Sequence, residues 1–279
     1  PCAFDAPLTA GRACAIDPTA TDPAITRTFG YHALGLPSAI TASTPVYVHF
    51  VGSGGDPAKP DTRAFPNQLL MEELTARGVL VVMPSYDNDP SVGSLCKEDL
   101  ACYEAVRREI LTGEDAPAPY SALKDVRAPN DARSRIAALI AAVAKSGLLG
   151  ADPPAALASG QLAWSKARLG GHSQGGGHAA LIAKTTVVER LCMLSSPIDG
   201  AGEGAAAVAV PWVSGTWATD LSRRRAVIHQ DDRGFDKASA NFAAMGLVED
   251  THWKRLKLAT TDPHAATVKD PTAAPARAA

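Results

Sequence analysis

Short apolar runs alternate with amphipathic segments along most of the chain. Runs that are apolar at nearly every position predict strands buried on both faces, at 46–51, 78–84, 163–169, 190–194, 226–229 and 255–259. Apolar residues at helical spacing predict helices at 68–77, 97–111, about 131–147, and after the glycines that follow position 173. Because strand, helix and strand in succession form right-handed βαβ units, the pattern predicts an α/β fold with a mostly parallel sheet flanked by helices.

The segments outside this pattern are predicted to belong to the same single domain, residues 1–279. Residues 1–24 hold four prolines and no sustained periodicity, which predicts an N-terminal arm lying over the body. Residues 26–36 are expected to form an antiparallel edge strand. The insertions at 85–129 and 198–221 are long enough to form a cap or lid, and the Ala/Pro-rich tail at 270–279 is expected to be mobile.

Composition excludes several classes of protein. Of 279 residues, 46% are hydrophobic and 20% charged, and the net charge is −2, so the chain has neither the signature of disorder nor a field that would gather nucleic acid. No apolar run approaches the ~18 residues of a membrane span. The chain opens on Pro1 rather than Met, which leads us to expect a processed mature protein.

Five cysteines indicate the compartment more by their placement than by their number. Cys2 and Cys14 bracket the N-terminal segment, and Cys96 and Cys102 lie in one insertion, so each pair could close a short loop. Cys192 lies in an apolar run, where a buried thiol behaves as a small hydrophobe. Loop-closing disulfides are typical of an oxidising environment, so we expect a secreted or periplasmic protein; reduced cysteines in a cytosolic enzyme are the alternative.

The strongest motif is Gly-His-Ser-Gln-Gly at 171–175, between a predicted strand and a predicted helix. A sharp strand-to-helix turn needs glycines at its flanks, where a Cβ would clash, and it leaves the central side chain exposed. Ser173 is therefore a candidate nucleophile. The alternative interpretation is a structural glycine-rich turn.

The residues around this turn resemble the elbow of α/β-hydrolase-fold serine hydrolases, a resemblance that extends over about residues 40–268. Residues 46–55 look like the strand and glycine-rich oxyanion loop of that fold, with Val51-Gly52 in place of the usual His-Gly pair. Residues 229–235 resemble the acid-bearing loop, and Asp262-Pro263-His264 the histidine loop. The resemblance implies an α/β-hydrolase fold with insertions forming a cap or lid.

A serine hydroxyl needs a base to remove its proton and a carboxylate to orient that base. In the resembled fold these follow the serine in the order acid, then histidine, which selects Asp232 and His264. His252 is the rival base, but it precedes the last predicted strand, whereas His264 follows it. Asp231 and Asp199 remain alternatives for the acid.

Backbone donors after the nucleophile and in the glycine loop would stabilise an oxyanion, which points to Gln174 and Ser53. Trp212 and Trp217 are candidates for lining a substrate pocket, although loop aromatics equally often cover a core. Asp87-Asn88-Asp89 has too few oxygen ligands for a calcium loop and is interpreted as a solvated turn, so no metal is assigned.

The predicted function is cleavage of carboxylic esters through an acyl-enzyme intermediate, with no cofactor. The substrate would be a small-molecule or polymeric ester. The alternatives are a peptidase or amidase with the same triad, and a non-catalytic binding module on the same fold. The sequence does not indicate the oligomeric state.

Overall fold

A nine-stranded sheet organises the protein, which is described by a computed structural model over residues 2–27 and 29–273. The spatial order of the strands is β1-β2-β3-β5-β4-β6-β7-β10-β11. The pairs from β5 through β11 are parallel, and β1, β2 and β3 add an antiparallel margin. The strands of the sheet are β1 Phe4–Leu8, β2 Gly11–Ile16, β3 His32–Pro37, β4 Val46–Phe50, β5 Leu80–Met83, β6 Ala167–His172, β7 Arg190–Leu194, β10 Arg224–His229 and β11 Trp253–Leu256.

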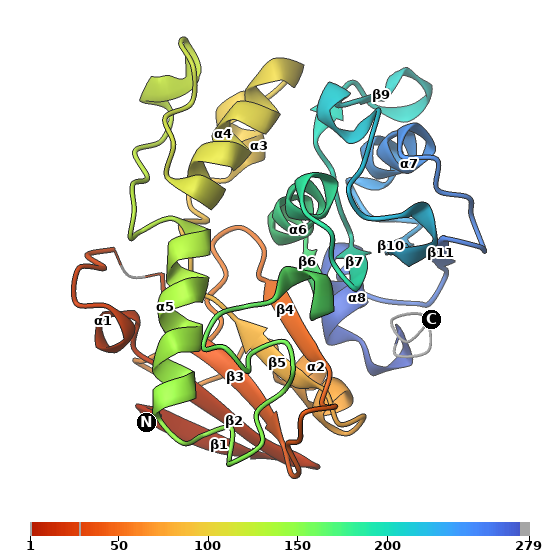
Figure 1. Cartoon of the computed structure of the whole chain (residues 1–279). Helices are drawn as coiled ribbons and strands as arrows, with labels where there is room; N and C mark the ends of the chain where they lie inside the picture. The colour runs from red at the N-terminus through yellow and green to blue at the C-terminus, as the bar shows by residue number, and fades with distance from the viewer. Residues whose placement is uncertain (1, 28, 274–279) are drawn as a thin grey trace.

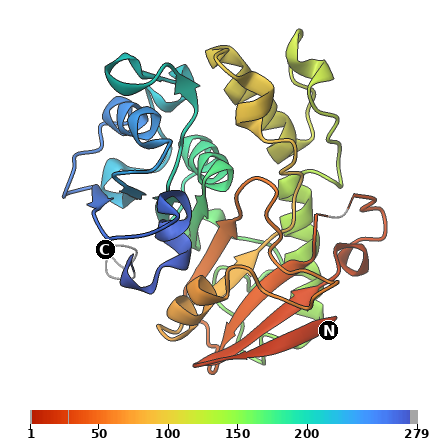
Figure 2. The same cartoon turned by 180° about the vertical axis from the view of Figure 1, so that it is seen from behind.

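Helices cover both faces of this sheet (Figure 1). They are α1 Pro18–Thr21, α2 Gln68–Thr75, α3 Val92–Cys96, α4 Leu100–Thr112, α5 Ala132–Lys145, α6 Gln174–Thr185, α7 Phe235–Ala244 and α8 Pro263–Lys269. Helices α4, α5, α6 and α7 contribute to the larger apolar core on one face, while α2 and α8 pack on the other face, seen from the front in Figure 2.

Side chains of the central strands alternate between these two cores. On β5, Leu80 and Val82 enter the larger core, whereas Val81 and Met83 pack in the smaller core that contains α2. All four are at most 1% exposed, because both faces of the strand are covered. The predicted α/β-hydrolase fold class, with a mostly parallel sheet and flanking helices, is confirmed.

The N-terminal segment differs from the predicted arm. Residues 1–24 contain the hairpin β1–β2, which pairs onto β3, so β3 is an internal strand and β1 is the edge. Phe4 and Leu8 alternate toward the core beside α2. Pro7 is tolerated because an edge strand does not need every N–H. Both strands are short and contain Gly or Pro, so the sequence does not show a clear alternation of apolar and polar residues there.

Both predicted disulfides are present. Cys2–Cys14 ties the start of the chain to β2, with a Cα–Cα distance of 5.3 Å, and Cys96–Cys102 joins α3 to α4 across 5.4 Å. Cys192 is half-buried on β7 rather than fully buried as expected.

The two insertions approach each other above the carboxyl ends of the parallel strands (Figure 1). Residues 85–129 contain α3 and α4, and residues 198–221 contain the short hairpin β8 Gly200–Ala201 and β9 Val208–Ala209. Of the predicted tail, 271–273 form a short 3-10 turn with Ala273 buried, and 274–279 lie outside the described residues. No helix in the described ranges is long and apolar enough to cross a membrane.

Candidate active site

Ser173 lies in a strained turn between β6 and α6, with φ 54° and ψ −125°. Glycine is required at the flanking positions because any side chain there would clash with neighbouring backbone atoms. A Cβ on Gly171 would approach the carbonyl carbon of Gly175 to 2.4 Å, and one on Gly175 would approach the carbonyl oxygen of Phe50 to 2.1 Å. The turn is therefore a sharp, strained strand-to-helix turn, and its serine is 9% exposed at the wall of a cavity.

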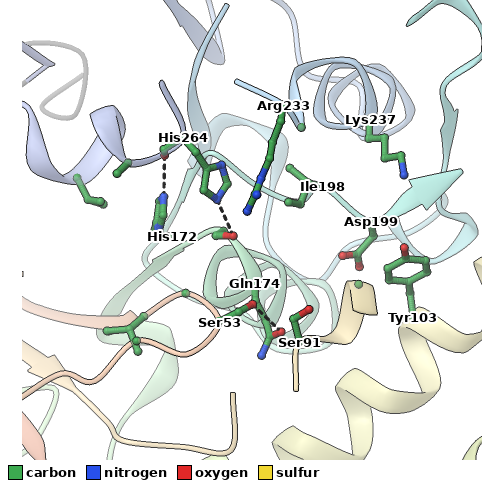
Figure 3. A pocket seen from close by; sticks show the side chains of 18 of the residues that line it. Ser53, Ser91, Tyr103, His172, Gln174, Ile198, Asp199, Arg233, Lys237 and His264 are labelled. Carbon is green, nitrogen blue, oxygen red and sulfur yellow. Dashed lines mark hydrogen bonds between the residues drawn. The ribbon is translucent and has the colours of Figure 1, made fainter. Parts of the chain in front are cut away.

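A continuous chain of hydrogen bonds joins Ser173, His264 and Asp232. The Ser173 Oγ donates to His264 Nε2 over 2.8 Å, and His264 Nδ1 donates to the Asp232 carboxylate at 2.9 and 3.0 Å. Figure 3 shows the ring of His264 beside that of His172 at the cavity. Asp232 follows β10 and His264 is the second residue of α8, so three segments distant in sequence converge. Burial raises the pKa of Asp232, but hydrogen bonds from His264 and Gly234 and the neighbouring imidazole outweigh it and hold that pKa below its usual value.

The backbone of His264 is held by two residues that sequence reasoning missed. Its carbonyl oxygen accepts from His172 Nε2 at 2.8 Å and from Ser195 Oγ at 3.0 Å. Burial, and secondly the neighbouring His264, lower the pKa of His172 to about 4, so it is a neutral ring that donates through Nε2. Nothing in the sequence marks this role, because it depends on α8 folding back over β6 and β7.

The glycine loop after β4 is pinned next to the serine. A Cβ on Gly52 would lie 3.3 Å from that of Ser173. The Asn88 amide donates to the carbonyls of Gly52 and Gly55 at 3.1 and 2.6 Å. The Ser53 hydroxyl donates to Gln174 Oε1 at 3.1 Å, and the N–H of Gln174 belongs to the first turn of α6, which has no intrahelical acceptor. Ser53 and Gln174 thus lie side by side next to Ser173.

The predicted solvated turn at 87–89 is wrong for its first two residues. Asp87 is 3% exposed and forms ion pairs with Lys124 Nζ at 2.5 Å and Arg27 at 2.9 Å. Asn88 is 2% exposed. Asp87 can be buried because its charge is neutralised by cations from the insertion and from the segment before β3. Asn88 is buried because its amide binds the glycine loop.

The rival acids and base lie elsewhere. Asp199 forms a bidentate ion pair with Arg107, with Nε to Oδ2 at 2.7 Å, and both side chains are at most 3% exposed. Arg107 also donates to the carbonyl oxygen of Gln174 at 2.9 Å, so the pair supports the start of α6. Asp231 is exposed and points toward His229. His252 precedes β11 and accepts from the Val248 N–H at 3.2 Å.

The two tryptophans are not where a substrate pocket would need them. Trp212 is 3% exposed and donates from Nε1 to Asp199 at 3.0 Å. Trp217 donates to the carbonyl of Val213 and lies under the guanidinium of Arg224. In the described part of the chain neither indole lines the cavity beside Ser173, so the prediction that they bind substrate is corrected. Both cover the core, and Trp212 also completes the hydrogen bonding of the buried carboxylate.

The cavity over Ser173 has a volume of about 600 Å³. Its walls come from the glycine loop, the two insertions, the loop after β10 and α8. Among the residues that the structure describes, ten charged side chains line it, five of each sign: Lys97, Arg107, Arg233, Lys237, Lys269, Asp56, Glu98, Asp199, Glu203 and Asp236. Within residues 2–27 and 29–273 no cluster of His, Cys, Asp and Glu has the arrangement of a metal site.

Solved structures of hydrolases share this fold. Poly(aspartic acid) hydrolase-1 from Sphingomonas sp. KT-1 is 13% identical over 98% of this chain and 100% of that chain, with a TM-score of 0.52. A thermostable esterase from Pseudomonas putida ECU1011 is 13% identical over 93% and 84%, with a TM-score of 0.48. Esterase B from Lactobacillus rhamnosis is 15% identical over 89% and 77%, with a TM-score of 0.49. The likeness to the Sphingomonas hydrolase, together with the sheet topology, shows that the chain has the α/β-hydrolase fold, as the resemblance implied. No protein-family model and no curated protein matched the sequence.

Proposed function

We propose that the chain is a serine hydrolase that cleaves carboxylic esters through an acyl-enzyme intermediate. The observation that carries the proposal is the unbroken hydrogen-bond chain from Ser173 Oγ through His264 to Asp232. A strained serine at an elbow, a histidine aimed at its hydroxyl and a buried carboxylate behind that histidine form a known solution to activating a weak nucleophile. The same three side chains also argue against a non-catalytic binding module.

In the first half-reaction, Ser173 Oγ attacks the ester carbonyl carbon while its proton passes to His264 Nε2. The ester carbonyl becomes an oxyanion, which the backbone N–H groups of Gln174 and Ser53 would stabilise. The intermediate then collapses: the bond to the alcohol oxygen breaks, and the proton on Nε2 goes to that leaving group. Asp232 accepts from Nδ1 throughout and stabilises the imidazolium.

In the second half-reaction, water replaces the serine as nucleophile. His264 takes one proton from the water, the hydroxide adds to the acyl carbon, and Ser173 leaves with that proton. The products are a carboxylic acid and the free enzyme, and no cofactor takes part in either step.

Amide cleavage is the second candidate, since the triad does not specify the acyl bond. The fold neighbour whose name gives poly(aspartic acid) as its substrate is the observation that keeps this candidate. A panel of matched acyl esters and amides distinguishes the two: we expect ester turnover to exceed amide turnover, and faster amide turnover would favour the amidase.

Two histidine variants test the base. His264→Ala is expected to lower kcat by at least ~10³-fold, because the serine loses its proton acceptor. His252→Ala is the matched control and is expected to keep near wild-type kcat, since that ring is outside the cavity. The reverse pattern would contradict the assignment.

We also propose that the protein works in an oxidising compartment, as a secreted or periplasmic enzyme. The two disulfides support this, because such bridges are rare in reducing cytosol.

A further inference from the structure

Arg233 is the charged residue next to the triad that the proposed mechanism does not use. It follows Asp232 directly, in a turn fixed by two hydrogen bonds from backbone N–H groups to Asp232. Gly234 N–H donates to Asp232 Oδ1 at 2.8 Å, and Phe235 N–H donates to the Asp232 carbonyl at 2.9 Å. The side chain of Arg233 lines the cavity and extends toward the ring of His264 (Figure 3).

Within residues 2–27 and 29–273, the guanidinium of Arg233 has no carboxylate as a partner. Of the five cations lining the cavity, Arg107 and Lys237 form ion pairs with Asp199 and Glu98. The other three, Lys97, Lys269 and Arg233, form none among the described residues, and of these Arg233 is the one that adjoins Asp232 in the sequence. Its acidic sequence neighbours are engaged otherwise. Asp231 faces His229, Asp232 accepts from His264, and Asp236 accepts from the N–H of Gly204.

The charges on the described residues that line the cavity balance overall. Five cations and five acids provide no field that would gather polyanions. A guanidinium without a carboxylate partner, in the same cavity as Ser173, instead favours one carboxylate at one position. Its planar pair of N–H donors can bind that carboxylate bidentately.

We propose that Arg233 forms a carboxylate subsite, and that the preferred substrates are esters carrying a second, free carboxylate. The inference rests on the proposed function, since it names the substrate class of the same site. Arg233 binds the group that does not react, and this orients the scissile ester over Ser173.

The test is a comparison of matched esters on wild type and Arg233→Gln. One pair carries the charge on the acyl side, 4-nitrophenyl hydrogen adipate against its methyl ester. The other carries it on the alcohol side, 4-carboxyphenyl butyrate against 4-carbamoylphenyl butyrate. In at least one pair, wild type is expected to prefer the carboxylate ester, with kcat/KM about tenfold or more above that of the neutral ester. Arg233→Gln is expected to remove that preference through KM, with neutral-ester turnover unchanged.

Two control variants sharpen the comparison. Arg233→Lys keeps the positive charge but loses the planar pair of N–H donors, so this variant is expected to keep part of the preference for the carboxylate ester. Lys237→Gln removes a cation that is paired with Glu98 in the same cavity, so it is expected to keep all of it. The preference is also expected to fall as salt is added, because Arg233 is exposed.

The outcomes separate the two claims. A wild type without carboxylate preference in either pair, or an Arg233→Gln enzyme equally impaired on charged and neutral esters, overturns the subsite. If wild type hydrolyses no ester or amide, the proposed function is wrong. The subsite is then judged by adipate binding in ligand-observed NMR: binding lost in Arg233→Gln supports it, and absent or unchanged binding overturns it.

Discussion

Asp199→Asn and Asp232→Asn alter two buried carboxylates that the account assigns to different tasks. The Asp199 pair with Arg107 is almost fully buried, at 3% and 2% side-chain exposure. Removing one charge from such a pair costs about 3–5 kcal/mol, and asparagine retains one acceptor, so we expect about 3 kcal/mol of lost unfolding free energy. The folded fraction is expected to keep kcat within about tenfold of wild type, because the pair touches α6 and not the reacting atoms.

Asp232→Asn is expected to do the opposite. The asparagine amide no longer holds His264 in the tautomer that accepts from Ser173, so kcat falls by up to about 10⁴-fold. The loss of unfolding free energy is expected to be the smaller of the two, since no buried cation loses its partner.

The assay is urea unfolding followed by tryptophan fluorescence, paired with kcat at saturating ester. Asp231→Asn is the control, and we expect both quantities near wild type because that side chain is exposed. If Asp199→Asn loses activity by a thousandfold with unchanged unfolding while Asp232→Asn stays active, the triad acid has been assigned to the wrong residue.

Two further predictions concern the whole chain. Alkylation of the denatured, unreduced protein is expected to modify one of five cysteines by intact mass, and five modified cysteines would contradict both disulfides. Burial lowers the pKa of His32 and His49 to about 3 and, with His264 nearby, that of His172 to about 4. Below pH 6.5, the ordinary pKa of a histidine side chain, the unfolded chain therefore binds protons at these three rings that the native state does not. Stability should be full above that pH and fall by up to about 1.4 kcal/mol per pH unit for each ring on acidification toward 4. Equal urea midpoints at pH 5 and pH 7 would refute this.

The sequence predicts the sheet well where local signals are strong. The run 46–51 is apolar at nearly every position, which indicates a buried strand. The glycines around Ser173 are required by contacts within their own turn and with the end of strand 46–51. The candidate histidine and acid follow from the chemistry that a serine needs and from chain order.

The features that were missed depend on contacts distant in sequence. Arg107 lies in the predicted helix 97–111, but only the fold brings Asp199 against it, from 92 residues further along the chain. Asn88 reads as a turn residue until the glycine loop packs on it. The pairing of β1 with β2 depends on a five-residue edge strand that contains a proline, which is too short and too interrupted for a clear period.

The site of covalent labelling by a fluorophosphonate probe tests the central claim most directly. Only an activated serine beside its base reacts rapidly, so peptide mapping is expected to find the adduct on Ser173. Ser173→Ala is expected to take up no label and to unfold at the same urea concentration as wild type. An adduct on another serine, such as Ser195 or Ser196, or no adduct on wild type, would contradict the assignment of Ser173 as the nucleophile.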